Sequence, residues 1–324
     1  MSFPELPRPT PGEVLLVSAC CEHDKALWGG LLDEVGGRRE NDVLVLGGGG
    51  VRLRPVEGSG WENLLGGNVP ALVPGGGLGS PVVVLADISV VYGGDGPLLV
   101  DLAGIPGRGV RVPSSRLGEI LAALAGGTLA FDDLVRGMDR RGMYEGDGGR
   151  PAHPVPVFPA PTLPSRFSFP ALPSTEQALL VRTSFDDEKG WRTLLDELGG
   201  ADEDGWIGTH LDPDEIDVDH FPLEALVVDD RAFEHLGPGQ VPALVPPGER
   251  TTLVALADAR TFADPDRPLT VVDLYCTPGH STLLPYGVVG SLVCNLAMAN
   301  MDFHEFVAVE GAEPWWEKRA RRSR

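Results

Sequence analysis

Residues 31–37 read Leu-Leu-Asp-Glu-Val-Gly-Gly, and residues 194–200 read Leu-Leu-Asp-Glu-Leu-Gly-Gly. A second pair is identical, because Val-Pro-Ala-Leu-Val-Pro occupies 69–74 and returns at 241–246. Similarity at so long and so nearly constant an offset indicates tandem domains and not a short-repeat solenoid. We therefore predict that the 324-residue chain contains two homologous domains, each large enough to bury a core of its own.

The segments around the two copies differ from them in composition. We predict a disordered N-terminus at 1–12, a first copy at 13–141, a linker at 142–177, a second copy at 178–311 and a basic tail at 312–324. The linker contains eight prolines. Such a composition favours extended or disordered chain over a packed core.

Apolar runs at matching places in the two copies predict the secondary structure. Each copy opens with a run typical of a buried strand, at 14–17 and 178–181, followed by an amphipathic helix that ends at Gly36 or Gly199. Further strands are predicted near 51–57, 82–85, 98–102 and 110–112, and near 223–229, 253–256, 269–274 and 282–284. Short helices are predicted near 62–65 and 232–236, and helices begin at Pro113, Pro285, Phe131 and Phe303. This order predicts an α/β fold in both domains, a mixed β-sheet with flanking helices.

The net charge of −21 is unevenly divided between the copies. Residues 13–141 sum to −5 and residues 178–311 to −18. Such a charge repels nucleic acid and anionic membranes and favours solubility or basic partners. The four cysteines have no zinc-binding or disulfide pattern, and no apolar stretch is long enough to span a membrane. We expect a cytoplasmic protein that binds no nucleic acid.

The second copy resembles a bacterial domain family of unknown function. The resemblance rests on the segments 179–187, 257–261 and 295–306, and its most specific part is Asn-Met-Asp-Phe at 300–303. In the first copy the aligned residues are Thr128, Leu129, Ala130 and Phe131, so only the phenylalanine is kept. The resemblance implies domain boundaries and implies no activity.

The polar residues of this signature form one candidate site. Asn300 suits the left-handed position that ends a helix, and Asp302 with Glu305 has the spacing of a capping box. Helix capping therefore explains these residues without a ligand. The alternative is that Asn295, Asn300 and Asp302 together hold a small polar ligand in a cleft.

A second candidate site lies at the ends of the predicted strands. Arg182, Asp186 and Asp187 follow the first strand of the second copy, and Asp229 and Asp258 follow the next two strands along the chain. Ligands collect at the carboxyl ends of parallel strands, where carboxylates can bind a divalent cation or act as acid and base. Alternatively, Asp186 or Asp187 caps the helix that follows.

Two further charged segments give weaker signals. The acidic stretch at 212–219 departs from the calcium-loop pattern at Ile216 and Asp217, and we interpret it as a solvated loop. Trp315 and Trp316 precede a basic tail that could touch an anionic surface or fold back onto the acidic domain. No glycine-rich phosphate loop, zinc-protease helix or nucleophile elbow is complete, so no cofactor is predicted.

These features favour a non-enzymatic binding or regulatory protein. In this hypothesis the first copy is mainly structural, the acidic second copy recognises a basic protein, and the two domains pair with each other. A toxin-neutralising immunity protein is one concrete version. The alternative is a metal-assisted or acid–base enzyme in which Asp186, Asp187, Asp229 and Asp258 converge.

Overall fold

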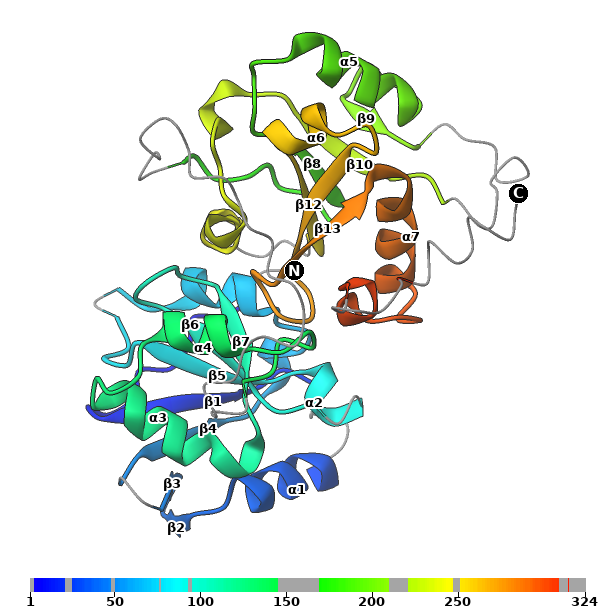
Figure 1. Ribbon diagram of the computed structural model, residues 1–324. Coiled ribbons are helices and arrows are strands. Elements are labelled where there is room, and N and C mark those ends of the chain that lie inside the picture. The colour runs from blue at the N-terminus through cyan, green and yellow to red at the C-terminus, as the bar shows by residue number, and fades with distance from the viewer. Residues whose placement is uncertain are drawn as a thin grey trace. The chain divides into compact units, whose positions relative to one another are not determined.

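The computed structural model describes residues 3–20, 25–47, 50–75, 77–92, 95–144, 169–209, 221–246, 251–308 and 314. The chain divides into two compact units, residues 1–151 and 152–324 (Figure 1). Each unit contains one copy of the repeated sequence. We refer to them as the first and the second domain.

The first domain is built on a seven-stranded mixed sheet of order β2-β3-β4-β1-β5-β6-β7. The central strand β1 runs parallel to β4 and β5, and the remaining neighbours are antiparallel. The strands are β1 (Glu13–Ser18), β2 (Arg38–Glu40), β3 (Val43–Val45), β4 (Arg52–Val56), β5 (Val82–Ala86), β6 (Leu98–Asp101) and β7 (Gly109–Arg111). The helices are α1 (Lys25–Val35), η1 (Ser59–Trp61), η2 (Gly66–Leu72), α2 (Ile88–Tyr92), η3 (Ser114–Arg116), α3 (Leu117–Ala125) and α4 (Phe131–Gly137).

The second domain repeats this plan in a six-stranded sheet of order β13-β12-β11-β8-β10-β9. Here β8 takes the place of β1 and runs parallel to β10 and β11. The strands are β8 (Ala178–Arg182), β9 (Trp206–Ile207), β10 (Ala225–Val228), β11 (Leu253–Ala257), β12 (Pro268–Asp273) and β13 (Ser281–Pro285). The helices are α5 (Glu188–Glu197), η5 (Arg231–Phe233), η6 (Pro238–Leu244), α6 (Ala259–Ala263), α7 (Tyr286–Ala297) and η7 (Phe303–Phe306). The predicted mixed α/β fold is confirmed in both domains.

Each sheet is buried on both faces. Successive residues of β8 point to opposite sides, so that Leu180 packs with Trp191 of α5 and Leu292 of α7, while Leu179 packs with Val241 of η6. The same division holds around β1, where α1, α3 and α4 cover one face and η1 and η2 cover the other. Strands between two apolar layers are near-continuous apolar runs, and this explains why the sequence located them.

Buried residues lie just outside the predicted starts of both copies. Leu6, in the segment expected to be disordered, is 2% exposed, and its N–H donates to the carbonyl of Leu72 at 2.8 Å. Leu172, in the expected linker, is 3% exposed and makes the equivalent bond to Leu244 at 2.8 Å. The carbonyls sit in the repeated Val-Pro-Ala-Leu segment, which forms η2 and η6. An apolar anchor therefore precedes the first strand of each copy.

Tyr144, just after the predicted end of the first copy, is buried, and its N–H donates to the carbonyl of Arg111 at the end of β7. Three predicted segments lie outside the described residues: the rest of the linker at 145–168, the acidic stretch at 212–219 and the tail from 315 to 324. In the part of the chain that the structure describes, no helix is long and apolar enough to cross a membrane.

Candidate functional site

Arg182 is the centre of the predicted strand-end site. It is the last residue of β8 and only 2% of it is exposed. Its Nη1 donates to Oε2 of Glu188 at 2.9 Å and to Oδ1 of Asp229 at 3.2 Å, and its Nε donates to the Ser184 carbonyl at 3.1 Å. The guanidinium therefore joins the end of β8 to the first turn of α5 and to the end of β10.

Aromatic rings complete the surroundings of this cation. The Arg182 guanidinium carbon lies 4.4 Å from the ring centroid of Phe185 and 5.4 Å from that of Trp191. Two carboxylates and two ring faces compensate the cost of burying the charge. The hydrogen bond from Arg182 lowers the pKa of Glu188 below its ordinary value. Both carboxylates stay about half exposed, at 56% for Glu188 and 43% for Asp229, so they form an acidic pair on the surface.

A tryptophan fixes the second carboxylate of this pair. Nε1 of Trp191 donates to Oδ2 of Asp229 at 2.9 Å. The first domain contains the equivalent bond, from Trp28 Nε1 to Glu57 Oε1 at 2.7 Å, although Ser18 stands there in place of Arg182. The tryptophan–acid bond is thus common to the two copies, and the buried arginine is specific to the second.

The other predicted carboxylates of the strand ends lie at helix starts. Asp187 is the N-cap of α5 and accepts from the Gly190 N–H at 2.8 Å. Asp258 is the N-cap of α6, accepts from the Arg260 and Thr261 N–H groups, and also bonds the Arg260 side chain at 3.1 Å. Asp186 is exposed. Helix capping thus explains Asp187 and Asp258. Among the described residues, no group of three or more His, Cys, Asp or Glu is arranged to hold a metal ion.

The signature polar residues form a helix-ending cluster after α7. The Asn300 N–H donates to the Asn295 carbonyl at 3.0 Å and the Ala299 N–H to the Leu296 carbonyl at 3.2 Å, the pair of bonds that defines a Schellman motif. The side chains of Asn295 and Asn300 also bond each other at 2.7 Å. The left-handed residue is Ala299, with φ 51°, so the prediction of Asn300 at that position is wrong by one residue.

Asp302 and Glu305 make half of the predicted capping box. The Asp302 N–H donates to Oε1 of Glu305 at 3.2 Å, while the Asp302 side chain is 58% exposed and has His304 Nδ1 at 3.9 Å. Helix η7 is a single 3₁₀ turn whose Phe303 and Phe306 side chains are buried. The bond between Asp302 and Glu305 therefore closes the turn that carries the buried rings of Phe303 and Phe306.

A buried aspartate that was not predicted from the sequence occurs in both copies. Asp273, which is fully buried, accepts from the N–H groups of Tyr275, Cys276 and Thr277 at 2.6–3.0 Å. Asp101, 2% exposed, accepts from the N–H groups of the equivalent residues 103–105 at 2.9 Å. The signal was present as Asp-Leu-x-x-x-Pro-Gly at 101–107 and 273–279. These aspartates hold the loop after β6 and β12, and therefore serve the fold.

The comparisons with known proteins agree with the duplication. A family model described as a domain of unknown function (DUF6924) matches residues 13–147 and again residues 177–315. No curated protein and no solved structure matches the chain. The two matched segments cover most of the 324 residues and coincide with the two sheets. The chain belongs to the DUF6924 family and carries two copies of its domain.

Proposed function

We propose that the protein is a non-enzymatic binding protein whose second domain recognises a basic protein partner through the acidic edge at the carboxyl ends of β8 and β10. The observation that carries the proposal is the pair of carboxylates on Arg182. Glu188 and Asp229 are fixed by a buried cation, yet each remains about half exposed. A carboxylate that is held in place loses little side-chain entropy on binding, which favours affinity.

Neighbouring charges extend this surface. Asp186, two residues before Glu188, and Asp230, directly after Asp229, are both exposed, and the carboxylate of Asp230 accepts from the Ala232 N–H at 2.8 Å. We call Asp186, Glu188, Asp229 and Asp230 the acidic edge. A lysine or arginine of a partner can bond the unused carboxylate lone pairs, because each ionised carboxylate offers about four acceptor sites. The uneven charge, −18 against −5, supports the assignment to the second domain.

Binding of a fluorescent nona-arginine peptide to the full chain tests the proposal. Fluorescence anisotropy is recorded at low and at high salt for the wild type and for the double variant Glu188→Gln, Asp230→Asn. We expect saturable, salt-sensitive binding that the double variant weakens by about threefold to tenfold, as for the loss of two exposed charge pairs.

The first domain offers a matched control. Glu119 and Asp133 are exposed carboxylates paired with Arg116 and Arg136, so Glu119→Gln, Asp133→Asn removes the same net charge elsewhere. We expect wild-type affinity from this control. Equal weakening by the two double variants would show that only net charge matters, and would overturn the acidic edge as the binding surface.

A further inference from the structure

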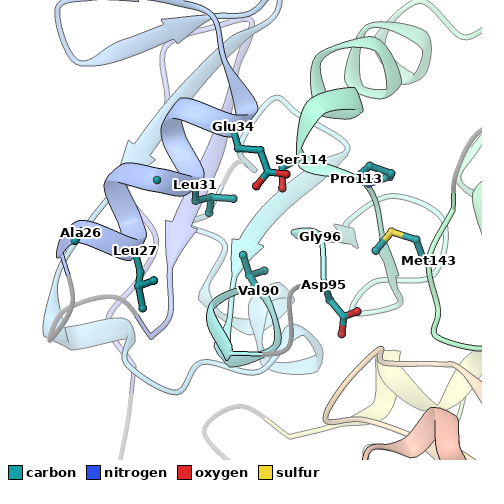
Figure 2. Close-up of a pocket in the computed structure, with 11 residues that line it drawn as sticks. Ala26, Leu27, Leu31, Glu34, Val90, Asp95, Gly96, Pro113, Ser114 and Met143 are labelled. Carbon is teal, nitrogen blue, oxygen red and sulfur yellow. The ribbon is translucent and has the colours of Figure 1, made fainter.

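The first domain has an open cavity that no sequence motif predicts. It has a volume of about 400 Å³ and lies between α1, α2 and the start of η3. Figure 2 shows Leu27 and Leu31 of α1 and Val90 of α2 around the gap, with Glu34 and Ser114 at one side of it and Asp95 at another. This volume falls in the range of small-molecule sites, which are mainly apolar with a few polar groups.

The second domain shows why the space is open. There Tyr286 stands in place of Ser114, and Thr193 in place of Gly30. Arg267 of the second domain stands where the first domain has Asp95 and Gly96. At these positions the first domain therefore has smaller or shorter side chains than the phenol, the guanidinium and the hydroxyl-bearing side chain of the second.

The same comparison identifies a carboxylate that has lost its partners. Glu197 of α5 forms an ion pair with Arg267 and a hydrogen bond with Tyr286. Burial and this carboxylate together raise the pKa of Tyr286. The equivalent of Glu197 is Glu34, whose carboxylate bonds no residue of the described chain. At the cavity the Glu34 carboxylate is therefore present without the two donors that its equivalent, Glu197, has in the second domain.

The charge of the lining points to the sign of a ligand. Glu34 and Asp95 line the cavity, and the described lining residues include no lysine or arginine. Two carboxylates with no lysine or arginine beside them among the described lining residues give the cavity a negative potential. An anionic ligand would be repelled, and an apolar one would leave the Glu34 carboxylate unused.

We propose that this cavity binds a small organic cation that has an apolar body and an amidinium, guanidinium or ammonium head, with the head on Glu34. The second domain provides the template, since its own Arg267 and Tyr286 donate to the equivalent carboxylate. The apolar body packs against Leu27, Leu31 and Val90. This site is separate from the acidic edge and does not depend on it.

Two probes of the same shape and opposite charge test the proposal. Isothermal titration of the full chain is carried out with benzamidine, an aromatic amidinium, and with benzoate. We expect saturable binding of benzamidine and none of benzoate. Failure of benzamidine to bind, or equal binding of the two probes, would overturn the proposal.

Variants locate the binding site. Glu34→Gln should lower the affinity for benzamidine about tenfold, because it removes a charge-assisted hydrogen bond. The variant should fold normally because Glu34 is exposed. Refilling the space by Gly30→Thr, Ser114→Tyr should abolish binding. The matched control Glu197→Gln changes the equivalent carboxylate of the second domain and should leave binding as in the wild type. Wild-type affinity in Glu34→Gln would contradict the proposal, whether or not the refilled variant folds.

Discussion

The indole N–H of Trp191 donates to the carboxylate of Asp229 at 2.9 Å, and this bond fastens α5 to the carboxyl end of β10. Trp28 and Glu57 make the equivalent bond between α1 and the end of β4. Both indoles are at most 5% exposed, and a buried indole N–H requires an acceptor. Since the bond is kept in two domains that differ around it, we assign it to the fold.

Replacing the indole tests this assignment. Trp191→Phe should lower the free energy of unfolding by about 1–3 kcal/mol, because it removes a hydrogen bond to a charged acceptor and part of a core ring. Chemical denaturation followed by circular dichroism measures the change. Trp61, whose Nε1 bonds the Pro4 carbonyl at the exposed surface, is the control, and Trp61→Phe should change stability by less than about 0.5 kcal/mol. Equal costs for the two variants would contradict the assignment.

The buried aspartate loop supports a second prediction. The Asp273 carboxylate accepts from three N–H groups. Asp273→Asn keeps the shape of the side chain but replaces one of its two acceptor oxygens with an NH2 donor. We expect a loss of about 2–3 kcal/mol in the free energy of unfolding, since buried N–H groups are left without a partner. Asp101→Asn in the first domain should have a similar cost. An unchanged denaturation midpoint in both variants would refute the role of these aspartates.

The end of α7 predicts a substitution that raises the stability of the chain. Ala299 has φ 51°, a left-handed conformation that costs a residue with a Cβ about 1–2 kcal/mol. The equivalent residue after α3 is Gly127, with φ 68° and no atom within 4 Å of an added Cβ. Ala299→Gly should therefore stabilise the chain and Gly127→Ala should destabilise it, each by about 0.5–1 kcal/mol. Thermal unfolding measures both, and a destabilising Ala299→Gly would show that the left-handed strain is not the controlling factor.

The pairing of Glu188 with Arg182 predicts a dependence of stability on pH. Because the hydrogen bond holds the pKa of Glu188 below 4.5, the folded state binds its proton less readily than the unfolded state. The contribution of the pair is present above pH 4.5 and is lost as the pH falls through the lowered pKa. Urea denaturation between pH 6 and pH 3 should therefore show a shallower loss of stability in Glu188→Gln than in the wild type. Parallel curves would contradict the ion pair.

The sequence predicted most of the sheet, because buried strands such as β1 and β8 are continuous apolar runs. It missed the edge strand β2, whose residues Arg-Arg-Glu are polar and wholly or partly exposed, and the helices α2 and α6, whose five residues are too few to show a helical period. These elements depend on tertiary contacts rather than on a local pattern.

Part of the candidate site could be predicted from the sequence, and part depends on tertiary contacts. Arg182 and Asp229 were identified from their places at strand ends, and the structure joins them at 3.2 Å. Glu188 and Trp191 were missed as their partners, because one lies in a helical turn and the other has the spacing of a core residue. The cavity beside Glu34 is lined by small residues such as Gly30 and Ser114. Small residues form no recognisable motif, so the cavity could not be predicted from the sequence.

Mapping where a basic peptide binds decides whether the acidic edge is the recognition surface. Amide chemical shifts of the isotope-labelled full chain are followed while unlabelled nona-arginine is added. We expect saturable shifts concentrated at residues 183–189 and 228–234, around the acidic edge, with the equivalent strand end at 57–62 of the first domain unchanged. Shifts of equal size at both strand ends, or none at the acidic edge, would contradict recognition through the acidic edge.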